Sequence, residues 1–339
     1  MRDLRPFLER LLDGQSLKVG EAEVLMEAMT DPETPAAVTG AVLAALRAKG
    51  EDTAEIQGFA RAMRHLAVQP VIPEEGPPLV DTCGTGGDGS GSINLSTAAA
   101  LVASAAGVRV VKHGNRSISS RAGSADVLEA LGVPVVLGPE AAADLLKRTG
   151  FTFLFAPHYH PAMGAVMPVR RALGVRTVFN ILGPLTNPAR PPHQVVGAFS
   201  LAAAEKMAHA LAGLHLVRGF VVHGAMGWDE ATPIGPFHLF DVRPGSVTHE
   251  LRDPADVGIP RCVAADLLGG DAQDNARALE TLLAGAPGAH RDAVCLSAGL
   301  ALEVTGVAKT MAEGIDLAGA ALDAGKGTAL LQALRAEAG

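Results

Sequence analysis

The stretch Gln69-Pro70-Val71-Ile72-Pro73-Glu74-Glu75-Gly76-Pro77-Pro78 divides the chain into two parts with different patterns. Proline interrupts helices and glycine loosens them, so these ten residues have the composition of a linker. Before the linker, apolar residues such as Leu4, Phe7 and Leu8 repeat at helical spacing. After it, short apolar runs alternate with helical stretches. The linker therefore separates an all-helical unit from a larger unit of another class.

Two helix starts can be placed in the N-terminal unit. Thr34-Pro35 supplies a cap followed by proline at the first helical position, and Asp52 with Glu55 has the spacing of a capping box. We expect helices to begin near residues 35 and 53.

Six apolar runs after the linker are strand candidates, at residues 79–80, 108–111, 133–137, 151–155, 195–199 and 220–222. Stretches of helical length rich in Ala and Leu lie between them, at residues 96–106, 125–131, 141–149 and 201–214. This alternation predicts an α/β fold with a central, mainly parallel sheet flanked by helices. Further helices are expected near residues 273–285, 293–303 and 309–325, where the sequence indicates no chemistry.

Residues 161–185 interrupt the alternation, because they are helical in pattern, contain prolines and exceed the usual length of a crossover. We expect them to join the N-terminal helices and to face the sheet across a cleft. The prediction is a discontinuous small helical domain of residues 1–70 plus about 161–190. The α/β domain then comprises residues 75–160 plus about 191–339.

The charge balance excludes partners that need a strong positive field. The 339 residues contain 28 Lys and Arg against 36 Asp and Glu, a formal net charge of −8. We therefore expect no nucleic-acid and no membrane partner. Because the N-terminal residues lack the apolar stretch of a secretory signal, we also expect a cytoplasmic location. The three cysteines, Cys83, Cys262 and Cys295, form no CxxC pair and predict neither a disulfide framework nor a zinc site.

The turn Gly84-Thr85-Gly86-Gly87-Asp88-Gly89 has the letters of the dinucleotide-binding pattern GxGxxG, but its context differs. In that pattern a helix begins directly after the glycines, whereas here the predicted helix begins only at Asn94-Leu95-Ser96-Thr97. No lysine follows the glycines, so a Walker P-loop is absent too. The turn predicts exposed N–H groups that surround an anion, with a second anion site at the helix N-terminus near residues 94–97.

Two later segments could serve the same anion. Lys112-His113-Gly114-Asn115-Arg116-Ser117-Ile118-Ser119-Ser120 follows a strand candidate and offers two cations, an amide and three hydroxyls, to which Ser124 adds another. This supply suits a ligand with several phosphate oxygens, although a solvated loop is the alternative. Asp229-Glu230 follows the strand candidate that ends near His223, and adjacent carboxylates can hold Mg²⁺.

Together and in this order, these segments resemble the motifs of the anthranilate phosphoribosyltransferase family. Further matches are Gly123-Ser124-Ala125-Asp126, His160-Pro161-Ala162-Met163, Arg170-Arg171 and Asn180-Ile181-Leu182-Gly183-Pro184-Leu185, and the resemblance runs from about residue 1 to 330. It implies a homodimer formed through the helical domains. It also implies the reaction of anthranilate with phosphoribosyl pyrophosphate (PRPP) to give N-(5-phosphoribosyl)anthranilate and pyrophosphate.

The resemblance assigns roles to individual positions. PRPP would be bound by Gly84, Gly87, Asp88, Ser92, Asn94, Leu95, Ser96, Thr97, Lys112, His113, Gly114, Asn115, Arg116, Ser117, Ile118, Ser119, Ser120 and Ser124. Mg²⁺ would be held by Ser96, Asp229 and Glu230, and anthranilate would face Gly84, Asn115 and Arg170.

The reaction implied by the resemblance needs no nucleophilic side chain and no strong base, because an aromatic amine is already neutral at pH 7. Lys112 and Arg116 would act electrostatically on the departing pyrophosphate and the cationic transition state. Neither His113 nor His158 is assigned a proton-transfer role, since each lies in a segment with a binding explanation.

Two other functions stay open. A pyrimidine nucleoside phosphorylase shares the architecture and would cleave thymidine or uridine without Mg²⁺, but its characteristic phosphate segments are not found at residues 84–88 or 112–120. A non-catalytic nucleic-acid-binding relative would retain DNA in a salt-sensitive way, which the acidic charge balance opposes.

Overall fold

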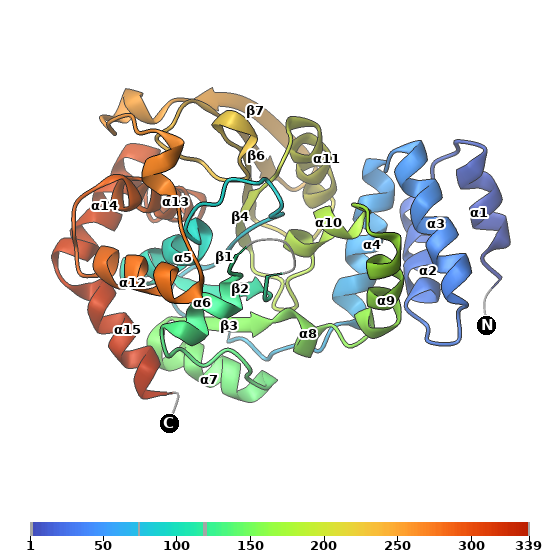
Figure 1. The fold of residues 1–339 in the computed structure, drawn as a ribbon, viewed down its shortest axis with the longest axis horizontal. Helices are drawn as coiled ribbons and strands as arrows, with labels where there is room; N and C mark the ends of the chain where they lie inside the picture. Colours follow the sequence, from blue (N-terminus) through green and yellow to red (C-terminus); the bar gives the residue numbers. More distant parts are fainter. Residues whose placement is uncertain (1–2, 74, 118–120, 338–339) are drawn as a thin grey trace.

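The N-terminal unit is helical, as predicted, in a computed structural model that describes residues 3–73, 75–117 and 121–337 (Figure 1). Its helices are α1 (Arg5–Leu12), α2 (Val19–Met29), α3 (Ala36–Lys49) and α4 (Thr53–Leu66). Asp52 caps α4 by accepting a hydrogen bond from the Ala54 N–H, and Glu55 accepts one from the Asp52 N–H at 2.8 Å. The capping-box prediction is therefore confirmed.

The start of α3 differs by one residue from the prediction. Pro35 occupies the N-cap position and the helix begins at Ala36. The Thr34 hydroxyl does not cap the helix, because it donates to the Ala28 carbonyl oxygen at 2.6 Å.

The α/β unit is built on a seven-stranded sheet with the strand order β3-β2-β1-β4-β5-β6-β7. The first five strands in the chain run parallel: β1 (Leu79–Gly84), β2 (Arg109–Gly114), β3 (Phe151–Phe155), β4 (His193–Gly197) and β5 (Arg218–His223). The strands β6 (Phe237–Arg243) and β7 (Ser246–Arg252) continue the sheet in antiparallel order. The predicted mainly parallel sheet is therefore confirmed.

The strand predicted at residues 133–137 is wrong. These residues form an irregular segment between α6 (Ser124–Ala130) and α7 (Pro139–Thr149). Val133 and Val135 are buried in the main core, whereas Val136 is exposed. The alternation of side chains therefore reflects burial of one face and not pairing with a neighbouring strand.

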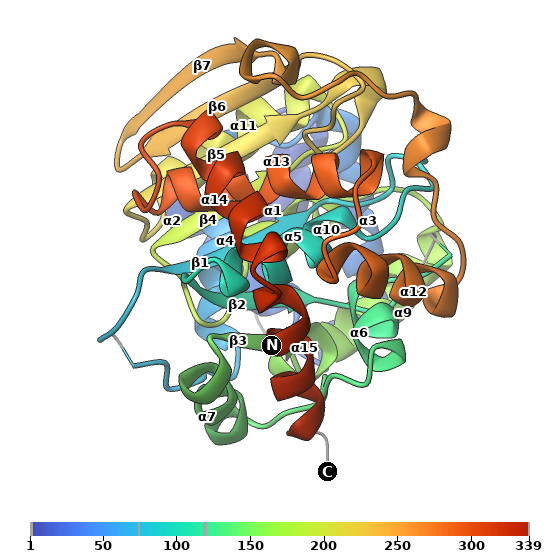
Figure 2. The ribbon, with the colours of Figure 1, turned by 90° about the vertical axis from the view of Figure 1, so that its left-hand side faces the viewer.

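Helices cover both faces of the sheet (Figure 2). On one face, α5 (Leu95–Ala105), α6, α12 (Ala272–Leu283), α13 (Ala289–Val304), α14 (Met311–Asp323) and α15 (Lys326–Ala336) build the larger core with the inward side chains of β1, β2, β5 and β6. On the other face, α11 (Leu201–Ala212) packs against Val196, Val221 and Phe240.

Residues 156–185 leave the sheet and form α8 (Ala156–Tyr159), α9 (Met163–Leu173), α10 (Phe179–Leu182) and the short helix η1 (Gly183–Leu185). Val166 and Val169 of α9 belong to the same apolar cluster as the helices α2 to α4, beside which α9 lies in Figure 1. This packing supports the assignment of residues 161–190 to the helical domain, which we keep as a proposal. The cluster continues through α11 to the sheet, so the two units share apolar core.

Within the described ranges, no helix is both long enough and apolar enough to cross a membrane.

Candidate active site

The predicted site segments meet at one edge of the sheet. The strands β1, β2, β4 and β5 run parallel, so their carboxyl ends, at Gly84, Gly114, Gly197 and His223, lie at the same edge. The predicted PRPP and metal segments follow the ends of β1, β2 and β5, whereas Arg170 lies on α9, which follows β3 and α8. This is the edge at which open α/β sheets bind ligands.

The loop after β1 adopts a backbone that only glycine accepts easily. Gly86, Gly87, Gly89 and Gly91 have φ between 64° and 74°, in the left-handed region that side chains disfavour. The N–H of Gly86 donates to Asp229 Oδ2 at 2.6 Å. The N–H groups of Gly87 and Asp88 meet no acceptor within the described part of the chain. Part of the predicted anion loop is therefore available to a ligand.

The segment that carries Asp229 and Glu230 packs closely against the carboxyl ends of β1, β4 and β5. A Cβ atom at Gly84 would lie 2.5 Å from Asp229 Oδ2, and one at Gly197 would lie 1.6 Å from the Asp229 carbonyl oxygen. A Cβ at Gly224 would lie 2.0 Å from the Glu230 carbonyl oxygen. Glycine is therefore required at these positions for the carboxylates to reach the sheet edge. The sequence prediction included Gly84 but not Gly197 or Gly224.

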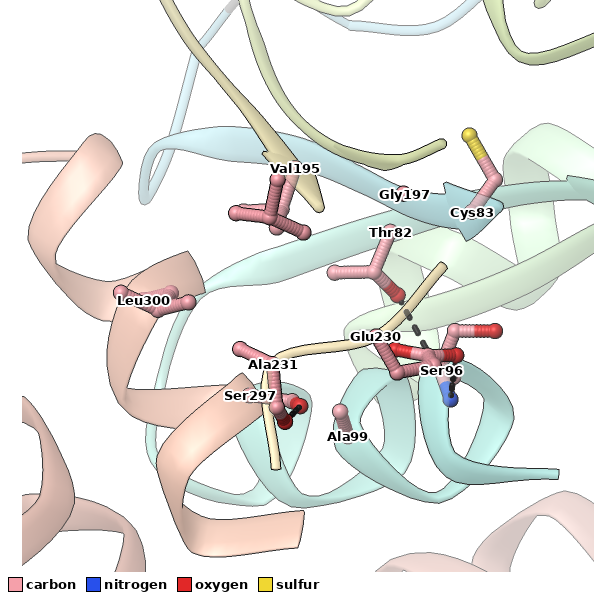
Figure 3. Close-up of a pocket in the computed structure, with 11 residues that line it drawn as sticks. Thr82, Cys83, Ser96, Ala99, Val195, Gly197, Glu230, Ala231, Ser297 and Leu300 are labelled. Carbon is pink, nitrogen blue, oxygen red and sulfur yellow. Dashed lines mark hydrogen bonds between the residues drawn. The ribbon is translucent and has the colours of Figure 1, made fainter. Parts of the chain in front are cut away.

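The first turn of α5 lies beside Glu230, one of the predicted metal residues, as Figure 3 shows for Ser96 and Glu230. The Ser96 N–H donates to Glu230 Oε1 at 3.1 Å, and the Ser96 carbonyl oxygen accepts from the Thr82 hydroxyl at 3.0 Å. Lys112 Nζ lies 3.4 Å from Ser96 Oγ and also donates to the Thr82 carbonyl oxygen. Lys112 is only 2% exposed, so its cation is held inside the site and not in solvent.

The N-terminus of α5 is less open than the sequence indicates. The N–H groups of Leu95, Ser96 and Thr97 already donate to Ile93, Glu230 and Asn94. Leu95 and Thr97 are buried, so these two residues could contact a ligand only after a rearrangement of the turn. Their predicted roles stay predictions.

Three carboxyl groups lie close together at this edge. The Asp229 N–H donates to Asp88 Oδ2 at 3.3 Å, and Asp88 Oδ1 accepts from the hydroxyl of Ser90. Burial, and then the negative charge of Asp88, raise the pKa of Asp229. Burial, and then Asp229, raise the pKa of Glu230, although Lys112 acts in the opposite direction. The charged forms of Asp229 and Glu230 are therefore disfavoured in the folded chain, mainly because both carboxyls are buried.

The donor set fits Mg²⁺ that keeps several water ligands. No group of three His, Cys, Asp or Glu side chains in the described residues is arranged to hold a metal ion alone. Mg²⁺ is commonly bound by one or two carboxylates together with substrate phosphates and water, and Asp229 and Glu230 supply such a pair.

The segment after β2 is partly engaged with α6. The Arg116 guanidinium binds Glu129 and Asp126, and the Asn115 carbonyl oxygen accepts from the Ser124 hydroxyl at 3.2 Å. The positive charge predicted for phosphate binding at Arg116 is thus neutralised by two carboxylates in this structure. Gly114 and Ser117 lie beside this turn, and Ile118, Ser119 and Ser120 fall outside the described residues.

His113 does not sit on the surface of the loop. Its ring lies 5.0 Å from that of His160, and both residues are buried. Burial, and then the neighbouring His160, lower the pKa of His113, while burial lowers the pKa of His160 to about 4. Both imidazoles are therefore neutral at pH 7.

Arg170 lies on α9, and no acidic side chain among the described residues pairs with it. Its guanidinium lies over the Phe179 ring at 5.2 Å and donates to Met167 Sδ at 3.7 Å, and it forms no ion pair with a carboxylate of the described residues. Burial lowers the pKa of Arg170 without altering its charge at pH 7. A half-buried, unpaired guanidinium is suited to a carboxylate ligand.

Asn275 on α12 contacts the site without having been predicted from the sequence. Its side-chain amide donates to Asn94 Oδ1 at 2.8 Å, and its own Oδ1 accepts from the Gly270 N–H at 2.7 Å. Nearby, Ser92 forms an isolated antiparallel β-bridge with Leu268, which lies just before α12. Asn275 is 2% exposed, and a buried asparagine 181 residues from its partner leaves no local signal in the sequence.

Comparisons with known proteins agree with this geometry. Residues 5–67 match the family described as "Glycosyl transferase family, helical bundle domain", and residues 76–328 match "Glycosyl transferase family, a/b domain". The chain is 51% identical over 332 residues to the anthranilate phosphoribosyltransferase of Solibacter usitatus, a match that covers 98% of this chain and 97% of that protein. It is 50% identical over 322 residues to the enzyme of that name from Desulforudis audaxviator, covering 95% and 92%.

Solved structures show the same arrangement. The anthranilate phosphoribosyltransferase of Thermus thermophilus superposes with a TM-score of 0.91 at 43% identity, covering 98% of each chain. The enzyme from Saccharomyces cerevisiae, determined in complex with PRPP and Mg, superposes with a TM-score of 0.89 at 25% identity and covers 99% of this chain and 97% of that one. The chain belongs to the anthranilate phosphoribosyltransferase family, within the glycosyl transferase family that both domain matches describe.

Proposed function

We propose that this protein transfers the 5-phosphoribosyl group of PRPP to the amine of anthranilate, releasing pyrophosphate, in tryptophan biosynthesis. The observation that carries the proposal is the arrangement around the first turn of α5. Lys112 Nζ lies 3.4 Å from Ser96 Oγ, and the Ser96 N–H binds Glu230, so a buried cation and a carboxylate meet at one helix turn beside the glycine loop. A diphosphate with a bound divalent cation needs both kinds of group.

Mg²⁺ is the proposed cofactor, held by Asp229 and Glu230 with Ser96 beside them. A yeast relative is described with PRPP and Mg bound. When bound, the ion would neutralise charge that develops on the pyrophosphate as the bond to the sugar breaks. The raised pKa of Asp229 and Glu230 supports this role, because a cation would offset the cost of keeping both carboxylates charged.

The chain's own residues would bind and orient the two substrates. The N–H groups of Gly87 and Asp88, which have no acceptor among the described residues, would donate to phosphate oxygens, and Lys112 supplies a fixed positive charge at the end of β2. The amine of anthranilate is neutral at pH 7 and needs no base. Holding it in line with the anomeric carbon would supply much of the remaining rate enhancement.

We assign anthranilate recognition to Arg170, together with Asn115 and Gly84. The proposal is supported by the lack of an acidic partner for Arg170 among the residues described. A guanidinium can bind a carboxylate through two parallel hydrogen bonds, which would fix the direction of the amine. A yeast relative is described in complex with 4-fluoroanthranilate.

A homodimer formed through the helical domains and a cytoplasmic location are also proposed. Both rest on membership of the family. Sedimentation velocity would determine the oligomeric state.

The direct test mixes the protein with Mg²⁺, PRPP and anthranilate and follows the loss of anthranilate fluorescence. We expect turnover that stops when PRPP or Mg²⁺ is left out. A parallel reaction with thymidine, phosphate and no Mg²⁺ should show no phosphorolysis. Phosphorolysis without loss of anthranilate fluorescence would overturn the proposed function.

A further inference from the structure

Arg176 joins two parts of the proposed site that no described strand or helix connects. It lies just after α9 in the segment that leads to α10, six positions beyond Arg170. Its Nη2 donates to the carbonyl oxygen of Gly87 at 2.6 Å. The glycine loop and the α9–α10 segment are thus linked directly, and in Figure 1 α10 lies beside that loop.

The Arg176 side chain and backbone are held in place by two further contacts. Its guanidinium carbon lies 4.4 Å above the ring centroid of Phe199, just beyond the end of β4. Its carbonyl oxygen accepts a hydrogen bond from Arg47 Nη1 of α3 at 2.8 Å. The guanidinium is therefore fixed by a ring of the α/β unit, and its backbone by the helical bundle.

Gly87 has a backbone conformation that favours glycine, and its carbonyl oxygen accepts the bond from Arg176. Its φ of 71° is left-handed, and its neighbour Gly86 donates to Asp229 Oδ2. The loop is held at one end by Thr85, whose hydroxyl accepts from the Phe199 N–H at 3.1 Å. These two contacts come from the α/β unit, whereas the bond from Arg176 comes from the helical unit.

We propose that Arg176 is a positioning residue for PRPP: it holds the Gly87 peptide so that the N–H groups of Gly87 and Asp88 point at the phosphates. The inference rests on the proposed function and deepens it. Arg176 acts through the loop and touches neither substrate. Its loss should weaken PRPP binding and leave anthranilate binding almost unchanged, the reverse of what is expected for Arg170.

The test compares Arg176→Ala, Arg176→Lys and the control Arg148→Ala, which removes another exposed arginine that is paired with Glu337 and distant from the site. We expect the KM for PRPP to rise about ten-fold in Arg176→Ala, because one hydrogen bond from a charged donor is lost. The KM for anthranilate should stay within about two-fold, and Arg176→Lys should recover part of the loss, since ammonium can still donate to Gly87 but stacks less well on Phe199.

Direct titration of PRPP with Mg²⁺ separates this inference from the proposed function. If the wild-type protein binds no PRPP, the proposed function fails. If the wild type binds PRPP and Arg176→Ala binds it equally well, with an equal KM, the inference is overturned. A matching rise in both KM values in Arg176→Ala would also overturn it, because that pattern indicates general loss of structure.

Discussion

The backbone at Gly197 lies so close to Asp229 that a Cβ atom there would be 1.6 Å from the Asp229 carbonyl oxygen. The backbone at the end of β4 therefore determines how closely the proposed metal-binding segment, Asp229-Glu230, can approach the sheet.

Gly197→Ala should displace that segment, because the clash is with backbone and cannot be relieved by a side-chain rotation. We expect Mg²⁺-dependent turnover to fall at least about ten-fold and the free energy of unfolding to drop by about 1–3 kcal/mol, as for other overpacked sites. Steady-state kinetics and thermal unfolding would measure both. The control is Gly20→Ala on α2, where nothing lies within 4 Å of the added Cβ. Equal activity of the two variants would contradict the interpretation.

Replacing both proposed metal ligands, as Asp229→Asn with Glu230→Gln, should abolish Mg²⁺-dependent turnover. The pKa of each carboxyl is raised in the folded chain, so the charged forms destabilise it, and metal-free wild type should gain stability as the pH falls from about 8 to about 6. The double variant should lose that pH dependence and be the more stable protein at the higher pH. Chemical unfolding in the presence of a chelator would measure this. Wild-type activity and metal response in the double variant would remove the metal assignment.

Arg170→Ala should raise the KM for anthranilate by about 10- to 100-fold, the range expected for a lost contact between two charged groups. The KM for PRPP should change little, because Arg170 contacts Met167 and Phe179 and not the glycine loop. Arg170→Lys should recover only part of the affinity. An unchanged KM for anthranilate in Arg170→Ala would rule out the proposed role.

Asn275→Ala should weaken PRPP binding although the residue lies on α12, outside the predicted motifs. The substitution removes one of two hydrogen bonds of the Asn94 side chain, the one accepted from Asn275, and leaves the one donated to the Ala122 carbonyl oxygen at 3.1 Å. We expect the KM for PRPP to rise about ten-fold. Asn275→Asp keeps an acceptor for the Gly270 N–H but cannot donate to Asn94, so it should share the kinetic defect. A folded Asn275→Ala protein with unchanged PRPP kinetics would show that the contact is only structural.

His160 should make the fold sensitive to acid. Its pKa is lowered to about 4 by burial, so the unfolded chain binds a proton near pH 6.5 that the folded chain does not. Above the unfolded pKa of about 6.5, His160 is neutral in both states and has no effect on the free energy of unfolding. As the pH falls from there toward 4, only the unfolded chain gains the proton, so the free energy of unfolding decreases. Between about pH 7 and pH 5 we expect His160 to cost the wild type about 2 kcal/mol. Urea unfolding at the two pH values should show a smaller difference in His160→Gln, and an identical difference would refute the assignment.

Local signals in the sequence predict most of the elements and most segments of the site. The capping box at Asp52 and the proline-rich linker depend on neighbours in the chain, and both have the expected structural effect. The apolar run at residues 133–137 predicts a false strand because buried loops and strands share the same residue types. The strand β7 is not predicted, since its residues are mostly exposed and polar.

Contacts between distant residues could not be predicted in the same way. Nothing near Asn275 in the sequence indicates that it binds Asn94, and nothing near Gly197 indicates the approach of Asp229. Arg116 illustrates the opposite case: its place in a basic, polar segment indicates a phosphate contact, whereas in the fold Glu129 and Asp126 bind its guanidinium. A residue type shows what a side chain can bind, and only the fold shows what is within reach.

The hydrogen bond between Asn275 and Asn94 also has a consequence for the order in which the site forms during translation. Asn275 is synthesised only after about four fifths of the 339 residues have been added, whereas Asn94 and the glycine loop leave the ribosome much earlier. A growing chain therefore carries Asn94 for much of translation without the partner that binds its side chain, and the surroundings of α5 are complete only after α12 and the later helices have been added.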